Sequence, residues 1–228
     1  MKLKKILAVM MAGAMMLSMA ACGGEETTTA ESTGEQKTID GNVLDAEQYF
    51  NGYLNSEPTT LDSVTGNDTY SSSILTNAME PLTRLAEKDG ENVREGAAAE
   101  AWESNEDGTV WTFHLRDNKW SDGQPVTAND YVYAITRVLT PETGSPNSWL
   151  LTCVKNANAV LAGEMDPSEL GVKAVDDKTI EFTLESPTPY FLALTDTRVM
   201  MPQRQDIVEQ YGESYGAEAS NMVYNGPF

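Results

Sequence analysis

Side chains that could perform acid–base chemistry stand at only a few suggestive places in the 228-residue sequence. His114 is the only histidine and lies within the segment WTFHL, where it would have to serve as the general base of a serine hydrolase. Adjacent acids occur at Glu106 and Asp107 and again at Asp176 and Asp177. Such pairs could supply the acid and the base of a glycosidase.

Both kinds of candidate favour a structural interpretation. His114 alternates with apolar residues of a predicted strand, which is typical of a structural imidazole. The acid pairs fall in predicted turns, where Asp and Glu are common for conformational reasons. The sequence contains no glycine-rich phosphate loop, nucleophile elbow or Cys/His metal spacing. We therefore predict no enzymatic activity, no cofactor and no bound metal.

The elements that carry these residues follow from periodicity. Alternation with a period of two predicts a strand at 110–115 and a hairpin within 172–184. Thr127 and Asp130 have the spacing of a capping box that starts a helix, and Pro141 ends it. Further short helices are predicted at 71–79, 156–161 and 203–211. Strands and helices mix without regular alternation, which predicts an α+β fold, a mixed α/β arrangement.

Several side chains can be assigned to core or surface by the same patterns. Trp111 and Trp120 are expected in the core or at its edge, and Cys153, in the apolar context LLTCV, is interpreted as buried. Tyr131, near the helix start, is compatible with surface packing. Trp149, in the loop SPNSWLL, is the aromatic most readily placed at a ligand cleft, with core packing as an equal alternative.

The N-terminus has the pattern of an export signal. The sequence MKLKKILAVMMAGAMMLSMAACGG has a basic start, an apolar run and small residues, so residues 1–21 are predicted to be a lipoprotein signal peptide. Cys22 then stands where a bacterial lipobox places its lipidated residue, and an ordinary secretory signal is the alternative. Residues 22–38 lack large apolar side chains and are predicted to be the lipidated cysteine and a flexible linker. We expect an extracytoplasmic protein, in the periplasm or on the outer face of the cell membrane.

The charge balance excludes some classes of binding partner. The chain has 15 Lys and Arg against 35 Asp and Glu, a net charge of −20. Nucleic acids and anionic lipid surfaces require positive charge. We therefore expect no nucleic-acid partner, and contact with the membrane only through the lipid anchor.

Five collinear segments are spread along nearly the whole of residues 50–228. They are NSEPTTLDS (55–63), MEPLTRL (79–85), the long block AAEAWESNEDGTVWTFHLRDNKWSDGQPVTANDYVYAITRVLTP (98–141), LGVKAVDDKTIEFTLESPTPYF (170–191) and the final NGPF. Together they resemble the N-terminal part of the bacterial extracellular solute-binding proteins of family 5, the oligopeptide-binding lipoproteins of ABC importers. The resemblance implies a periplasmic-binding-protein-like type II fold, with the ligand held between two lobes.

The same resemblance implies a division of the chain. Residues 39–81 and 202–228 would belong to the first lobe, and 82–201 would form an inserted α+β domain. The second lobe would be absent, so that the chain is expected to be an N-terminal fragment.

The resemblance also implies a site and its partners. Asn67, Asp68 and Thr69 match the segment that runs along the ligand, and Asn147 or Trp149 matches a contact from a later loop. The implied partners are short peptides and the ABC permease and ATPase subunits, with the receptor itself a monomer. Other solutes of this family, such as nickel complexes, haem or oligosaccharides, remain alternatives, as do a peptide sensor or chaperone and, less favoured, an extracellular hydrolase.

Overall fold

The computed structural model describes residues 38, 39, 42, 43 and 51–227, which fall into two units divided after Gly52. In the first unit, the two-residue strands β1 (Thr38–Ile39) and β2 (Asn42–Val43) pair in antiparallel fashion. The predicted signal peptide, Cys22 and the linker up to residue 37 lie outside the described residues. Within the described part, no helix has both the length and the apolar character needed to cross a membrane.

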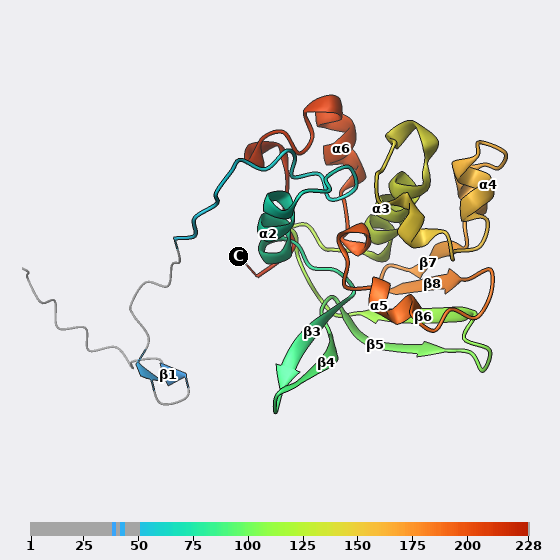
Figure 1. Cartoon of the computed structure of the whole chain (residues 1–228), viewed down its shortest axis with the longest axis horizontal. Helices are drawn as coiled ribbons and strands as arrows, with labels where there is room; N and C mark the ends of the chain where they lie inside the picture. The colour runs from blue at the N-terminus through green and yellow to red at the C-terminus, as the bar shows by residue number, and fades with distance from the viewer. Residues whose placement is uncertain (1–37, 40–41, 44–50, 228) are drawn as a thin grey trace, which may run out of the picture. The chain divides into compact units, whose positions relative to one another are not determined.

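The second unit is built on a four-stranded antiparallel sheet with the strand order β5-β6-β8-β7 (Figure 1). Its strands are β5 (Ala99–Ser104), β6 (Val110–Leu115), β7 (Val172–Asp176) and β8 (Thr179–Thr183). Phe113 of β6 and Ile180 and Phe182 of β8 are fully buried, and the residues between them are more exposed. The strand and the hairpin predicted from the period of two are therefore confirmed.

A second, two-stranded sheet projects from this unit (Figure 1). Strands β3 (Thr83–Lys88) and β4 (Glu91–Gly96) pair along their whole length, and most of their side chains are exposed or half-buried. Asp89 and Gly90 join them with φ angles of 54° and 82°. Positive φ at both positions suits a tight two-residue hairpin turn, a signal that the sequence analysis did not use.

The helices cover the sheet and connect it to the ends of the unit. Asp130 Oδ2 accepts a hydrogen bond from the Thr127 amide at 2.8 Å, so α3 (Ala128–Leu139) starts at the predicted capping box and ends before Pro141. Helix α3 packs against β7 and β8. The other helices are α2 (Thr69–Ala78), α4 (Ala157–Leu161), α5 (Phe191–Leu194) and α6 (Gln205–Tyr211), with 3₁₀ turns η1 (Pro141–Thr143), η2 (Ser148–Leu151), η3 (Pro167–Glu169), η4 (Arg198–Met200), η5 (Gly212–Ser214) and η6 (Ala219–Asn221).

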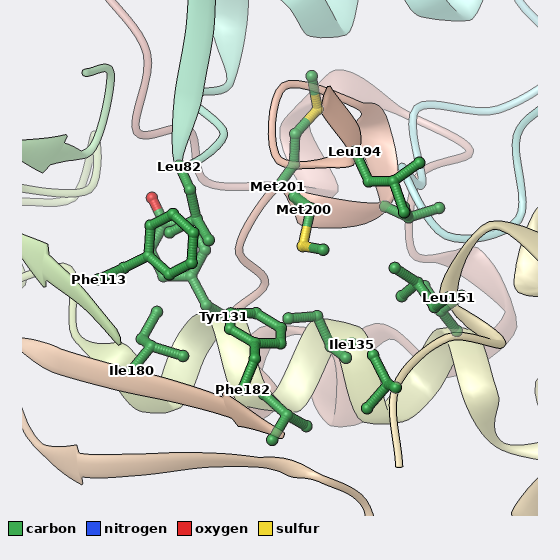
Figure 2. Packing of buried hydrophobic residues seen from close by; sticks show 14 of the residues in the cluster. Leu82, Phe113, Tyr131, Ile135, Leu151, Ile180, Phe182, Leu194, Met200 and Met201 are labelled. Carbon is green, nitrogen blue, oxygen red and sulfur yellow. The ribbon is translucent and has the colours of Figure 1, made fainter. Parts of the chain in front are cut away.

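The main core lies between the sheet and α3 (Figure 2). Its aromatic centre is formed by Phe113, Phe182 and Phe191, whose rings meet edge to face at centroid distances from 5.2 to 6.5 Å. Trp120 is buried as predicted, and Tyr131 has no exposed surface. The surface position that the sequence left open for Tyr131 is therefore excluded: its hydroxyl has an internal acceptor, the Glu80 carbonyl, at 3.0 Å.

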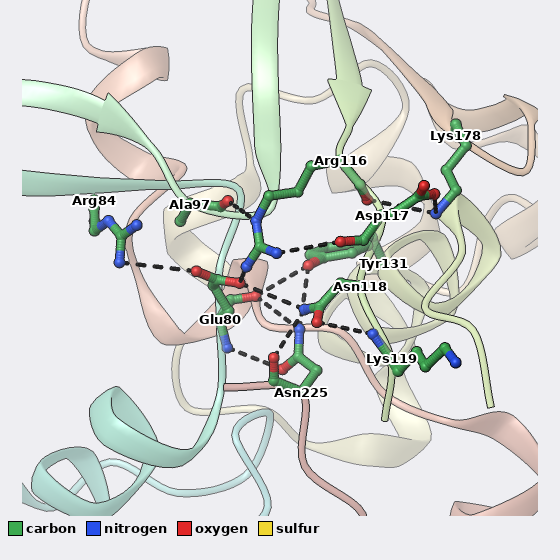
Figure 3. Close-up of polar contacts among 10 residues, drawn as sticks. All are labelled: Glu80, Arg84, Ala97, Arg116, Asp117, Asn118, Lys119, Tyr131, Lys178 and Asn225. Carbon is green, nitrogen blue, oxygen red and sulfur yellow. Dashed lines mark hydrogen bonds and ion pairs between the residues drawn. The ribbon is translucent and has the colours of Figure 1, made fainter. Parts of the chain in front are cut away.

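A buried polar network joins the last described residues to the middle of the unit (Figure 3). Asn225 accepts from the Glu80 amide at 2.9 Å and donates to the Glu80 carbonyl and to the Tyr131 hydroxyl. The Asn118 amide donates to the Asn225 carbonyl at 2.8 Å. Arg116 forms an ion pair with the Glu80 carboxylate, of which only 6% is exposed. Buried polar groups of this kind need such partners, because an unpaired one is costly.

Candidate functional site

The side chain of Asp68 forms hydrogen bonds within the protein. Asp68 is the N-cap of α2, and its carboxylate accepts hydrogen bonds from the Ser71 amide at 2.8 Å and from the hydroxyls of Ser71 and Thr59. The side-chain hydrogen bond from Ser71 is the main cause that holds the pKa of Asp68 well below its ordinary value, followed by that from Thr59. Three hydrogen bonds from within the protein therefore hold the Asp68 carboxylate at the start of α2.

The backbone around Asn67 has a pattern suited to an extended partner. Two carbonyls are used internally: that of Gly66 accepts from Asn147 Nδ2 at 2.9 Å, and that of Asp68 accepts from the Ser72 amide at 3.2 Å. Among residues 51–227, neither the amide nor the carbonyl of Asn67 has a hydrogen-bond partner, and Asn67 is exposed. Backbone donors and acceptors need partners when they are covered. These two groups are therefore available to a bound molecule.

The second predicted segment lies directly against the first. Asn147 contacts Gly66 through its side-chain amide, and the Ser145 hydroxyl donates to the Val64 carbonyl at 2.6 Å. Asn147 therefore contacts Gly66, the residue directly before Asn67, although Asn147 and Asn67 are 80 positions apart in the sequence. The amide of Asn147 serves this packing contact. Trp149, two residues further on, is 67% exposed, and no aromatic contact ties it to the described core.

Asp62 organises the turn that precedes Asn67. The residue is 4% exposed, and its carboxylate accepts from the Val64 amide at 3.0 Å and from Gln203 Nε2 at 2.7 Å. It also forms an ion pair with Arg137 at 3.1 Å. The Asp62 carbonyl accepts from the Gly66 amide at 2.9 Å. Three segments distant in sequence are therefore joined beneath the candidate site.

This role of Asp62 was not predicted from the sequence, in which the residue appears only as part of the segment NSEPTTLDS. Its partners Arg137 and Gln203 lie 75 and 141 residues further along the chain. An acid between apolar positions, in Leu61-Asp62-Ser63-Val64, is a local sign of a buried carboxylate, but no local pattern identifies its partners.

The acid–base candidates do not converge. His114 Nε2 lies 3.0 Å from Glu103 on the neighbouring strand, and the histidine side chain is 42% exposed. Asp176 accepts from the Lys178 amide in the β7–β8 turn, and this backbone hydrogen bond is the main cause that lowers the pKa of Asp176. Across the described residues, no group of three or more His, Cys, Asp or Glu side chains is placed to hold a metal ion.

Comparison with known proteins defines the class to which this fold and segment belong. The sequence profile of the bacterial extracellular solute-binding proteins, family 5 Middle, matches residues 93–228. The chain therefore belongs to this family, which is one of solute-binding proteins and not of enzymes.

Individual relatives agree with this class and differ in ligand. The chain is 35% identical over 209 residues to the dipeptide-binding protein of Lactococcus lactis, covering 91% of this chain and 34% of the relative. It is 38% identical over 188 residues to the probable deoxycholate-binding periplasmic protein YgiS of Escherichia coli, covering 81% and 34%. The chain thus spans about a third of the length of these relatives.

A solved structure confirms the fold. The substrate-binding domain of an oligopeptide ABC transporter from Bacillus anthracis superposes with a TM-score of 0.77 at 46% identity, covering 81% of this chain and 35% of that one. The predicted α+β, periplasmic-binding-protein-like fold and the predicted family are therefore confirmed.

Proposed function

We propose that this chain is part of an extracytoplasmic receptor that captures peptides and delivers them to an ABC importer. The observation that carries the proposal is the unpaired, exposed backbone of Asn67 between the two internally bonded carbonyls of Gly66 and Asp68. Peptides of different sequence share only their backbone, so a receptor can bind them as an added strand through backbone hydrogen bonds.

The geometry supports a division of roles in this site. The amide and carbonyl of Asn67 pair with the ligand backbone, and the exposed indole of Trp149 offers apolar surface to ligand side chains. Hydrated pockets accept variable side chains, because water can bridge polar groups that do not meet directly. The remaining wall of the site comes from a second lobe, whose closure over the ligand presents a shape to the permease.

The anchor and the monomeric state belong to the same proposal. Lipidated Cys22 tethers the receptor to the outer face of the membrane, and the receptor acts as a monomer without catalysing a reaction. Incorporation of labelled fatty acid into the wild-type chain, with none into Cys22→Ser, is the expected result. Equal labelling of both would exclude Cys22 as the anchor.

Calorimetry on the longest natural polypeptide that contains this chain tests the peptide assignment, with a mixture of short peptides as titrant. Asn67→Pro removes the backbone donor and should weaken binding about tenfold, the value of roughly one hydrogen bond. Asn67→Ala keeps the backbone and should bind as the wild type does. Equal affinity of all three proteins would place the peptide elsewhere, and thermal melts check that both variants fold.

A second solute class is supported by the similarity to YgiS, which is named for deoxycholate. The same titration therefore includes deoxycholate, a nickel complex, haem and an oligosaccharide. Tight binding of one of these, together with no response to any peptide, would replace the peptide assignment while keeping the receptor class.

A further inference from the structure

Arg198 reaches from η4 to the start of α2. Its Nη2 donates to the Asp68 carbonyl at 3.1 Å and also to the Ser72 hydroxyl. The two segments are 130 residues apart in the sequence. Through these two contacts, the guanidinium holds the carbonyl that follows Asn67 and the first turn of the helix.

The guanidinium also lies close to the Cα of Gly66, on the side where a side chain would begin. A Cβ atom on Gly66 would stand 3.2 Å from Arg198 Nη1 and 3.1 Å from the Asp62 carbonyl, tighter than ordinary contacts. Nη1 is buried and has no acceptor in the described part of the chain. Burial lowers the pKa of the Arg198 guanidinium, and the nearby charge of Asp68 opposes this effect. The Arg198 guanidinium therefore packs against the backbone of Gly66 and Asp68.

Other arginines of the unit act through carboxylates. Arg84, Arg94, Arg116, Arg137 and Arg204 each form an ion pair. Within residues 51–227, no carboxylate lies within ion-pair distance of Arg198, whose two hydrogen bonds go to a carbonyl and a hydroxyl. Its contacts thus act on the conformation of the Asn67 segment.

We propose that Arg198 is a positioning residue for ligand binding, and this inference rests on the proposed function. Asn147 holds the carbonyl before Asn67, and Arg198 holds the carbonyl after it. The backbone between them is thereby fixed at an exposed position, where its own amide and carbonyl have no partner within residues 51–227. A segment held in its binding conformation before the ligand arrives loses less conformational entropy on binding.

The test compares Arg198→Met with Arg94→Met in the longest natural polypeptide. Arg94 is a matched control because it is a largely buried arginine on β4 that donates to the Thr83 hydroxyl and pairs with Asp196. Arg198→Met should speed hydrogen exchange at the bonded amides of Gly66, Ser71 and Ser72. It should also weaken peptide binding about tenfold through the loss of preorganisation.

Arg94→Met should change neither quantity, even where it lowers the melting temperature. Arg198→Lys should recover part of the affinity, because one ammonium can still donate to the Asp68 carbonyl. If Arg198→Met abolishes the cooperative melt, the lysine variant replaces it in the comparison.

The two possible failures are distinguishable. Exchange in the Arg198 variant no faster than in the Arg94 variant overturns the positioning role, whether or not peptide binds. Faster exchange with unchanged peptide affinity overturns the link between positioning and binding. A wild-type protein that binds none of the peptides contradicts the proposed function, and the exchange rates still decide whether Arg198 fixes the segment.

Discussion

At the scale of single residues, Asp62 connects stability to the shape of the candidate site. Its carboxylate is the shared acceptor for the Val64 amide, Gln203 and Arg137. Gln203 is 1% exposed and the Arg137 side chain 19%. Removal of the acid therefore takes the only carboxylate partner from the Arg137 guanidinium, and leaves the buried amide of Gln203 with Arg137 and Ser63 as its remaining side-chain partners among the described residues.

We expect Asp62→Ala to reduce the free energy of unfolding by roughly 3–5 kcal/mol, as happens when one partner of a buried ion pair is removed. Urea denaturation followed by circular dichroism measures this change. The control is Asp206→Ala, because the Asp206 side chain is 61% exposed and its pair with Arg204 should contribute no more than about 1 kcal/mol. Equal losses in the two variants would contradict the role given to Asp62.

Tyr131 should make stability depend on alkaline pH. Burial is the main cause that raises the pKa of this phenol well above its ordinary value of 10.0, and the charge of Glu80 adds to the effect. The unfolded tyrosine ionises near pH 10 and the folded one at higher pH. The stabilisation is therefore complete below pH 10 and is lost as the pH rises towards the folded pKa.

Urea denaturation at pH 7 to 11 should show a steeper loss of stability above pH 10 in the wild type than in Tyr131→Phe. Tyr215, whose pKa burial also raises, leaves some dependence in the variant. At neutral pH the variant should be less stable by about 1 kcal/mol, the value of its hydrogen bond to Glu80. Tyr190→Phe, at a position that is 60% exposed, serves as the control. Parallel pH curves for wild type and Tyr131→Phe would contradict this account.

At the scale of elements, the start of α3 shows which features local sequence can predict. The capping box and the β7–β8 hairpin follow from residues at most a dozen positions apart, and both are present. The β3–β4 hairpin was missed although Asp89-Gly90 is a strong turn signal. Strand β5 was missed for a different reason: AEAWES contains no β-branched residue, and the strand is stabilised by pairing with β6.

The candidate site divides in the same way. Asn67, Asp68 and Asn147 could be found by resemblance to the family, and the structure places them together. The hydrogen bonds that hold the Asp68 carboxylate come from residues 3 and 9 positions away, so this N-cap was a local signal that was missed. The contact from Arg198 could not be found, because its partners lie up to 130 residues away. Local patterns carry no information about such distant partners.

Asp130 couples the start of α3 to the turn that precedes it. Its carboxylate accepts from the Thr127 amide and from Trp120 Nε1, and Trp120 is 2% exposed. Asp130→Ala leaves both donors without an acceptor, so we expect a loss of roughly 1–3 kcal/mol in the free energy of unfolding. Chemical denaturation measures it, with the neighbouring exposed Asn129→Ala as the control. A loss no larger than that of Asn129→Ala would show that other groups, such as water, satisfy the two donors.

At the scale of the whole molecule, the core crosses the boundaries that the sequence analysis places at 81/82 and 201/202. Val64, Leu75 and Met79 precede the first boundary and belong to the same buried cluster as Phe113 and Phe182. The network of Glu80, Arg116 and Asn225 crosses both boundaries (Figure 3). The packing joins residues 53–227 into one compact unit. The division into a lobe and an inserted domain stays a prediction.

This packing predicts a single unfolding transition for a polypeptide of residues 53–228 and a much weaker one for residues 82–201 alone. The shorter piece lacks Val64, Leu75 and Met79, each at most 2% exposed in the complete chain. Their burial contributes about 1.5–3 kcal/mol each, which together approaches the whole stability of a typical domain, about 5–15 kcal/mol.

All four tryptophans lie within 82–201, so fluorescence reports on the same residues in both polypeptides during urea denaturation. Removal of residues 1–52 alone should leave the transition of the full chain unchanged, since the described residues divide into two units after Gly52. If 82–201 instead unfolds at the same urea concentration as 53–228, the insert holds its own core. The contacts of Val64, Leu75 and Met79 would then serve to dock one domain on another, and Asp62 and Arg198 would act at a boundary between domains.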